Sequence, residues 1–158
     1  MERICTNIEQ SKKLMELGID VNTANMYWLN RFIDLTQTKY VLFVVDRSEK
    51  HIDFFNSYAV AVEKGEIIPA WSLTALLKLI KSEIYGETIY GDTITYKVDF
   101  RKYKLTDDVD LYQIAYGSIK FDVDGQYSFK DMVNTGQKED PIDAAFQMVV
   151  WLKENGKI

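Results

Sequence analysis

The chain is poor in the side chains on which disulfides, metal sites and most nucleophilic enzymes depend. It has 158 residues but a single cysteine, Cys5, and a single histidine, His51. A disulfide within the chain needs two cysteines, and a structural zinc site needs about four Cys or His ligands, so neither can form. Because an unpaired cysteine is usual in reducing compartments, we expect a cytoplasmic protein.

Long apolar runs and concentrated charge are also missing. The longest uninterrupted apolar run covers residues 40–45, whereas a membrane-spanning helix needs about 20 apolar residues. Charged side chains recur through residues 2–16, so we expect no signal peptide and no membrane association. The net charge of −5 and the scatter of the 19 basic residues along the chain disfavour nucleic acid as a partner.

Catalytic and cofactor motifs are absent as well. The sequence has no glycine-rich phosphate-binding loop, zinc-ligand pattern or nucleophile elbow. Cys5 precedes a predicted helix, where the pKa of a thiol can be lowered, but its one available histidine base is His51, in a charged segment. Asp122, Asp124 and Gly125 match the first half of a calcium loop without its later ligands, which favours a hairpin turn. We expect no catalytic, cofactor or metal site, and we do not expect an enzyme.

What the sequence does contain is the composition of a folded domain. Apolar residues make up 47% of the chain and charged residues 27%, which are ordinary globular values. The two prolines are not part of a linker, and no repeat or low-complexity tract divides the chain. We therefore predict one domain, residues 1–158.

Capping residues and apolar stripes predict three helices. The segment 140–156 has Asp140 as its N-cap, followed by a proline at the first helical position, and Gly156 as its stop. A second helix begins at a capping box formed by Thr6 and Glu9 and ends at Gly18. A third is capped by Ser72, and its apolar stripe consists of Leu73, Leu76, Leu77, Ile80 and Ile84.

Residue alternation predicts several strands. Residues 40–45 form a β-branched and aromatic run that is typical of a central strand, while residues 26–33 suit a strand or a short helix. Residues 47–64 are interpreted as a helix followed by a strand. After Gly86 the period becomes twofold, and strands are predicted at 93–100, 111–116, 118–123 and 126–129. The predicted fold is α+β, an antiparallel sheet of about 4–5 strands packed against about 3–4 helices.

The last helix has more apolar surface than one core contact requires. Its core stripe runs from Ile142 to Leu152, and Trp151 points about 180° from Ile142 at 100° per residue. Ala144, Met148 and Trp151 form a second apolar seam. Either the helix is sandwiched inside the fold by residues 26–64, or this seam contacts a partner or a second copy. Trp and Met are frequent interface residues, so we treat these three as a possible interface.

Three long stretches, residues 5–24, 68–77 and 140–149, together resemble a group of small uncharacterised proteins encoded by gut bacteria of the Bacteroides type and by their phages and mobile elements. The stretches cover about a third of the chain. The resemblance implies an accessory protein of phage or mobile-element origin acting inside a bacterium. It implies no particular activity.

Two functions follow as hypotheses. The first is a protein-binding module that recognises a protein partner or forms a homodimer. The alternative is a small-molecule-binding protein or enzyme with a pocket between sheet and helices, lined by tyrosines and carboxylates. The 13% aromatic content and the many unassigned acids motivate this alternative.

Overall fold

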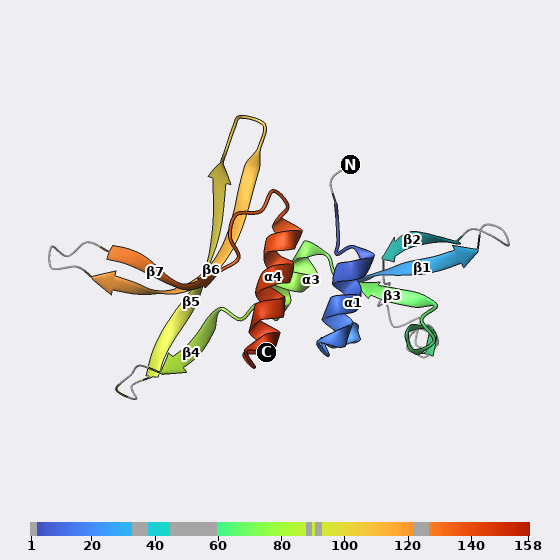
Figure 1. Ribbon diagram of the computed structural model, residues 1–158, viewed down its shortest axis with the longest axis horizontal. Helices are drawn as coiled ribbons and strands as arrows, with labels where there is room; N and C mark the ends of the chain where they lie inside the picture. Colours follow the sequence, from blue (N-terminus) through green and yellow to red (C-terminus); the bar gives the residue numbers. More distant parts are fainter. Residues whose placement is uncertain (1–2, 33–37, 45–59, 88–89, 91–92, 122–126) are drawn as a thin grey trace. The chain divides into compact units, whose positions relative to one another are not determined.

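Helices and two antiparallel sheets make up the described part of the chain in the computed structural model, which covers residues 3–32, 38–44, 60–87, 90, 93–121 and 127–158 (Figure 1). The α+β class is therefore confirmed. The chain divides into two compact units, Met1–Leu76 and Leu77–Ile158, with the division inside helix α3 (Leu73–Leu79). The assignment of residues 1–158 to one domain stays a prediction.

The first unit contains helix α1 (Ile8–Glu16), the 3-10 turn η1 (Val21–Thr23) and a three-stranded sheet in the order β2-β1-β3. The strands are β1 (Met26–Phe32), β2 (Thr38–Val44) and β3 (Ile67–Ala70). The predicted central position of β2 is wrong: β1 is central, and β2 pairs with β1 alone among the described strands. Its residues 40–43 are half-buried, because only a strand with neighbours on both sides and cover on both faces is fully enclosed.

Helix α1 begins one residue later than its sequence predicts. Asn7 is the N-cap, and it forms a capping box with Gln10: the Asn7 side chain accepts from the Gln10 N–H at 2.9 Å, and the Gln10 side chain accepts from the Asn7 N–H at 3.1 Å. Thr6 is not the cap, since its side chain is buried and bonded elsewhere. Gly18 closes the helix with φ of +72°, as predicted.

Buried hydrogen bonds of Thr6 connect the N-terminal segment to the end of β3. The Thr6 hydroxyl accepts from the Trp71 N–H at 3.0 Å and shares a 2.8 Å hydrogen bond with the Ser11 hydroxyl. The Thr6 N–H donates to the Trp71 carbonyl at 2.9 Å. Trp71 is fully buried, and its indole N–H donates to the Thr23 hydroxyl at 2.9 Å. Every polar group in this network has a partner, as burial requires.

Between residues 60 and 87, two elements of the structure differ from those predicted. Residues 60–63 are helical, so the strand predicted to end the segment 47–64 is wrong there, and residues 45–59 lie outside the described residues. The helix capped by Ser72 is confirmed, with the Ser72 hydroxyl accepting from the Ala75 N–H at 3.3 Å. It ends at Leu79, and Ile84 belongs instead to strand β4 (Glu83–Glu87), where it is buried against the sheet.

The second unit contains a four-stranded antiparallel sheet in the order β4-β5-β6-β7 and helix α4 (Pro141–Glu154). The strands after β4 are β5 (Thr93–Lys104), β6 (Asp110–Phe121) and β7 (Tyr127–Asn134). The predicted meander is confirmed, but the two short strands predicted at 111–116 and 118–123 are one strand, β6, with a register shift at Tyr116/Gly117. A bulge of this kind bends a strand without ending it. The predicted turn at residues 124 and 125 lies outside the described residues.

The pairing of this sheet is staggered along each strand. Strand β5 pairs with β4 through residues 93–97 and with β6 through residues 97–104. Strand β6 pairs with β7 through residues 115–121. Among the described strands, only Lys97, Ala115, Tyr116 and Gly117 pair with a neighbouring strand on both sides. The sheet therefore has a small centre from which hairpin arms extend, and the β5–β6 hairpin stands clear of β4 and β7 (Figure 1).

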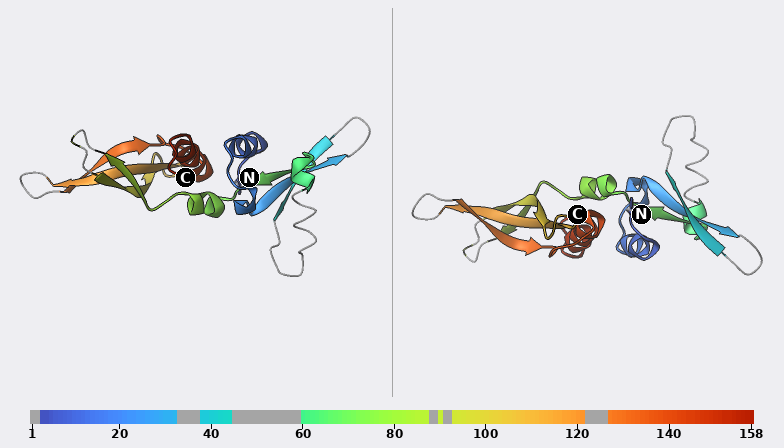
Figure 2. Two further views of the ribbon diagram at one scale, coloured as in Figure 1. Left: turned by 90° about the horizontal axis from the view of Figure 1, so that it is seen from below. Right: turned by 90° about the horizontal axis from the view of Figure 1, so that it is seen from above.

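Helix α4 packs along β6 (Figure 1 and Figure 2). Its boundaries follow the prediction: the Asp140 carboxylate accepts from the Ile142 N–H at 2.8 Å, and Gly156 adopts φ of +63°. The Gly156 N–H then donates to the Lys153 carbonyl at 3.1 Å and the Lys157 N–H to the Leu152 carbonyl at 2.8 Å. These two bonds are those of a Schellman motif, which ends a helix at a left-handed glycine.

Candidate interaction surface

The predicted seam on α4 is largely inaccessible. Ala144 and Met148 have no exposed surface, while Trp151 is half-buried. The indole of Trp151 is thus the one part of this seam that solvent reaches. The seam stays a prediction, and any contact it makes with a partner must be made through Trp151.

The β5–β6 hairpin carries a second, more exposed set of apolar side chains. Phe100 is 53% exposed and Leu105, just after β5, is 63% exposed. Tyr103 is 37% exposed, and its hydroxyl donates to the side-chain oxygen of Gln113 at 3.1 Å. We call Phe100, Tyr103 and Leu105 the arm residues; because side chains alternate along a strand, Phe100 lies on one face of the hairpin and Tyr103 on the other. Large apolar side chains are usually withdrawn from water, so several on one projecting hairpin indicate a contact surface.

A polar network on the sheet stiffens the base of this arm. Arg101 of β5 forms a double hydrogen bond with the carboxylate of Asp131 on β7, at 2.6 and 3.0 Å. It also donates to Asp99 at 2.7 Å and to Gln113 of β6 at 3.2 Å. The guanidinium therefore links three strands. Bidentate arginine–carboxylate bonds constrain geometry strongly, so the arm is held at a set angle to the rest of the sheet.

Both partners of this ion pair have perturbed pKa values. The hydrogen bonds from Arg101 lower the pKa of Asp131, and the bonds to Asp131 raise the pKa of Arg101. Each group favours the charged form of the other. The pair is therefore fully ionised at neutral pH, and its charges are satisfied within the network.

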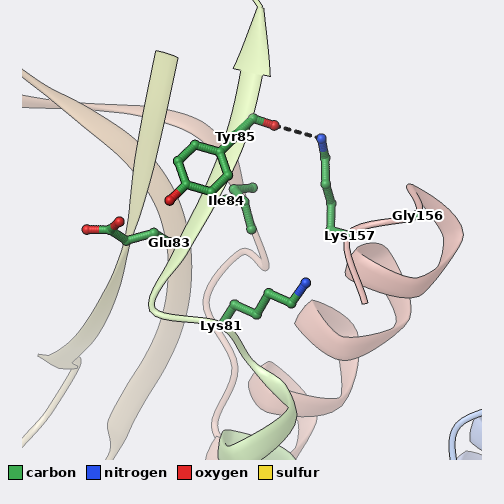
Figure 3. Close-up of a pocket in the computed structure, with 6 residues that line it drawn as sticks. All are labelled: Lys81, Glu83, Ile84, Tyr85, Gly156 and Lys157. Carbon is green, nitrogen blue, oxygen red and sulfur yellow. Dashed lines mark hydrogen bonds between the residues drawn. The ribbon is translucent and has the colours of Figure 1, made fainter. Parts of the chain in front are cut away.

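A shallow hollow lies between β4 and the end of α4 (Figure 3). Its volume is about 240 Å³, and its lining residues are Lys81, Glu83, Ile84, Tyr85, Gly156 and Lys157. The helix-ending turn at Gly156 brings Lys157 here, where its ammonium donates to the Tyr85 carbonyl at 2.8 Å. Figure 3 shows the side chains of Lys81 and Lys157 on the same side of β4. Two cations at one small hollow suit an anion of a few atoms.

The cysteine is placed where it cannot act as a nucleophile. Cys5 is 1% exposed and packs with Met26 and Ala70. Burial raises the pKa of its thiol to about 11, so the thiol stays protonated at neutral pH. The interpretation of Cys5 as a small buried residue is confirmed. His51 lies outside the described residues.

The tyrosines do not form one cluster. Tyr96, Tyr112 and Tyr116 belong to the same face of the sheet, whereas Tyr103 belongs to the other, because successive residues of a strand alternate between faces. Tyr116 is fully buried, and its hydroxyl donates to the carbonyl of Lys81. Desolvation raises the pKa of this phenol to about 12. Packing within the fold is therefore its role.

Acidic residues do not converge in the described ranges. No group of three or more His, Cys, Asp and Glu side chains there could hold a metal ion. Asp107 and Asp108 are exposed in the turn between β5 and β6. None of the helices formed by the described residues is both long and apolar enough to span a membrane.

Comparison of the chain with protein-family models, curated proteins and solved structures gives no match.

The sequence does not predict the exposure of Phe100. The alternation of β5 puts Phe100 on the same face as Ile94, Tyr96 and Val98, which predicts a buried Phe100. Alternation identifies a face but not how far along the strand that face is covered. The staggered pairing, which leaves the far half of β5 without β4, is a tertiary feature.

Proposed function

We propose that the protein is a protein-binding module and that the β5–β6 arm is its contact surface. The observation that carries this proposal is the exposure of Phe100 (53%) and Leu105 (63%) on a hairpin that projects from the sheet. A projecting hairpin of this kind gains little stability from its own packing. Two large apolar side chains that stay exposed on this hairpin contribute little to folding, and exposed apolar side chains of this kind are typical of binding surfaces.

The setting that we propose is the cytoplasm of a bacterium of the Bacteroides type, with the protein as an accessory factor of phage or mobile-element origin. This setting rests on the resemblance of residues 5–24, 68–77 and 140–149. The protonated, buried thiol of Cys5 agrees with a reducing compartment.

The test compares capture of proteins from a lysate of such a bacterium by three baits. Phe100→Ser/Leu105→Ser removes the exposed apolar surface of the arm. Tyr90→Ser is the matched control, because Tyr90 is 85% exposed between β4 and β5, on a different hairpin. We expect the double variant to lose a protein that the wild-type chain and the Tyr90 variant retain. If all three baits retain the same proteins, the arm is not the contact surface.

Trp151 offers a second route to self-association that the same work can check. Trp151→Asp places a charge at the accessible end of the α4 seam. We expect it to leave the fold intact and to shift any dimer observed by light scattering towards monomer. Unfolding of this variant would show instead that the indole serves the core of the chain.

The second candidate function is binding of a small anion at the hollow beside β4. The presence of Lys81 and Lys157 among its lining residues favours it. The hollow is small for anion binding: its volume is about 240 Å³, whereas pockets that enclose a ligand usually measure about 300–1,000 Å³. A thermal-shift series with phosphate, nucleotides and dicarboxylates would support it if one of them raised the melting temperature of the wild type but not of Lys81→Ala/Lys157→Ala.

A further inference from the structure

Among the residues that the structure describes, the outer edge of β5 has no partner along the arm. The Val98 N–H donates to the Ser82 carbonyl at 3.0 Å, so the backbone groups of Val98 point towards the β4 side. Backbone groups alternate in direction along a strand, and those of Phe100, Lys102 and Lys104 therefore point the same way. Strand β4 pairs with β5 only as far as Lys97. Within the described part of the chain, no strand pairs with β5 beyond that point on this side.

The opposite side of the hairpin confirms this direction. Tyr112, the cross-strand partner of Lys102, exchanges two backbone hydrogen bonds with Lys138, at 2.7 and 2.9 Å, on the far side of β6. Ile114, the partner of Phe100, likewise accepts from the Thr135 N–H at 3.0 Å. Since Tyr112 and Ile114 turn their backbone groups away from β5, Lys102 and Phe100 turn theirs away from β6. Strand β6 is covered on its outer side, whereas none of the described strands covers β5.

The chain protects another of its edges. On β4, the Lys157 ammonium donates a hydrogen bond of 2.8 Å to the outward-pointing carbonyl of Tyr85. Capping an edge with a lysine is a common way of preventing further strand pairing. No comparable bond to Phe100, Lys102 or Lys104 is found among the described residues.

We propose that the β5 edge from Phe100 to Lys104 binds an extended segment of a partner protein as an added β-strand. This inference rests on the proposed protein-binding function and specifies its partner. Backbone hydrogen bonds give such complexes their affinity, and side chains beside the edge give them specificity. The edge therefore defines which residues the partner segment must carry.

An antiparallel segment added to this edge places acidic residues opposite Lys104 and Lys102 first and an apolar residue opposite Phe100 last. Phe100 lies next to Ile114, which is 4% exposed, so an apolar side chain opposite Phe100 extends the core outward. Lys102 already binds Asp110 at 2.7 Å, while the exposed Lys104 forms no ion pair in the described ranges. An acidic side chain opposite Lys104 can pair with this exposed ammonium.

A second copy of the chain fits this edge poorly. Antiparallel pairing of two β5 edges places Lys102 against Lys102 when Phe100 faces Lys104. It places Arg101 against Arg101 when Phe100 faces Lys102. Like charges directly opposite each other destabilise a strand pair. The occupant is therefore a different segment with acidic residues.

The first test is amide hydrogen exchange of the peptide-free protein, followed residue by residue by NMR. We expect the amides of Phe100, Lys102 and Lys104 to exchange rapidly and those of Arg101 and Tyr103, which face β6, to be protected. Equal protection of all five amides would mean that the edge is occupied and would overturn the proposal. If the protection appears only as the protein concentration rises, the occupant is a second copy, which also overturns it.

The second test titrates a short synthetic peptide that alternates threonine with glutamate and ends in Thr-Leu, so that leucine faces Phe100 and two glutamates face the lysines. Binding should protect the amides of Phe100, Lys102 and Lys104. The same peptide with N-methyl groups on its edge-facing amides should not bind. Failure of the unmodified peptide to bind, up to its limit of solubility, overturns the proposal.

Protein variants separate strand addition from simple side-chain contact. Lys102→Pro removes an outward N–H that β6 does not use, and proline is tolerated on edge strands. We expect it to weaken peptide binding by about tenfold, the equivalent of one good hydrogen bond. Lys102→Ala keeps the N–H and should weaken binding by about threefold or less. If the proline variant does not fold, the N-methylated peptide still tests whether binding depends on backbone hydrogen bonds.

Failure of this inference and failure of the proposed function give different results. If capture depends on Phe100 and Leu105, but the proline variant and the N-methylated peptide behave like their unmodified counterparts, partners dock on side chains. Strand addition is then wrong while the binding module stands. If capture is also unchanged by Phe100→Ser/Leu105→Ser, both are wrong.

Discussion

Replacing Thr6 with valine tests the buried network that connects the N-terminal segment to β3. Valine has nearly the same shape as threonine, so the change removes the hydroxyl and leaves the volume almost unaltered. That hydroxyl accepts from the Trp71 N–H at 3.0 Å and shares a 2.8 Å bond with Ser11. Thr6, Ser11 and Trp71 are all fully buried. Water cannot replace the lost bonds, so the Trp71 N–H is left without a partner and the Ser11 hydroxyl loses its bond to Thr6.

The expected cost follows from counting these two groups. An unsatisfied buried donor or acceptor costs about 1–3 kcal/mol. The Ser11 hydroxyl lies in α1 and can turn to a carbonyl in the preceding turn, so its share is at the low end. We expect Thr6→Val to lower the free energy of unfolding by about 2–4 kcal/mol. Ser11→Ala should cost about 1 kcal/mol, because Thr6 can still accept from Trp71.

Urea unfolding monitored by circular dichroism gives both values, and the double variant gives their coupling. In Thr6→Val/Ser11→Ala the serine hydroxyl no longer exists to be left unpaired. The double variant should therefore be more stable than the sum of the single changes predicts, by at least about 0.5 kcal/mol. Thr6→Ser, which keeps the hydroxyl, is the matched control. A Thr6→Val protein as stable as the Thr6→Ser protein would refute the role that we assign to this hydroxyl.

Three further experiments test other parts of the fold. Gly86→Ala should destabilise the chain by about 1–3 kcal/mol in urea unfolding, since a Cβ at residue 86 would lie 2.9 Å from the Tyr96 ring; an unchanged midpoint would mean that the ring moves aside freely. Asp131→Asn should cost about 1–2 kcal/mol at neutral pH, because its pair with Arg101 is only partly exposed. The lowered pKa of Asp131 means that this contribution is complete above the usual aspartate pKa of about 3.9 and is lost as the pH falls through the lower folded value, so the stability difference from wild type should vanish in acid. Cys5, with its pKa raised to about 11, should resist alkylation at neutral pH until urea unfolds the chain, as mass spectrometry can show; rapid labelling of the folded protein would contradict its burial.

Local signals were sufficient for much of the second unit. The helix boundaries at Asp140 and Gly156 were predictable because capping depends on residues within one turn of each helix end. The alternation of residues 93–100 identified β5 for a similar reason, since it reflects the geometry of one strand. The predicted seam of Ala144, Met148 and Trp151 shows the limit of such signals. Periodicity placed all three on one side of α4 but could not say that two of them are covered completely.

Elements that depend on distant neighbours were predicted less well. Ile84 fits the stripe of the helix before it, yet it pairs with Tyr96 in the sheet. Thr6 is a typical capping residue, yet its hydroxyl accepts a hydrogen bond from Trp71, which lies 65 positions further along the chain. In both cases the local preference is worth about 1 kcal/mol, and a buried tertiary contact outweighs it.

The sequence by itself determined which segments are helices and strands in the meander and the last helix, because those choices follow from spacing and capping within a few residues. Only the tertiary structure decided where the cover over each face ends. Strand β4 stops opposite Lys97, and the edge of β5 from Phe100 onward is left without a neighbour among the described residues. The exposed phenylalanine and the open edge arise from that staggered pairing, which depends on how neighbouring strands align and so leaves no periodic pattern within any one of them.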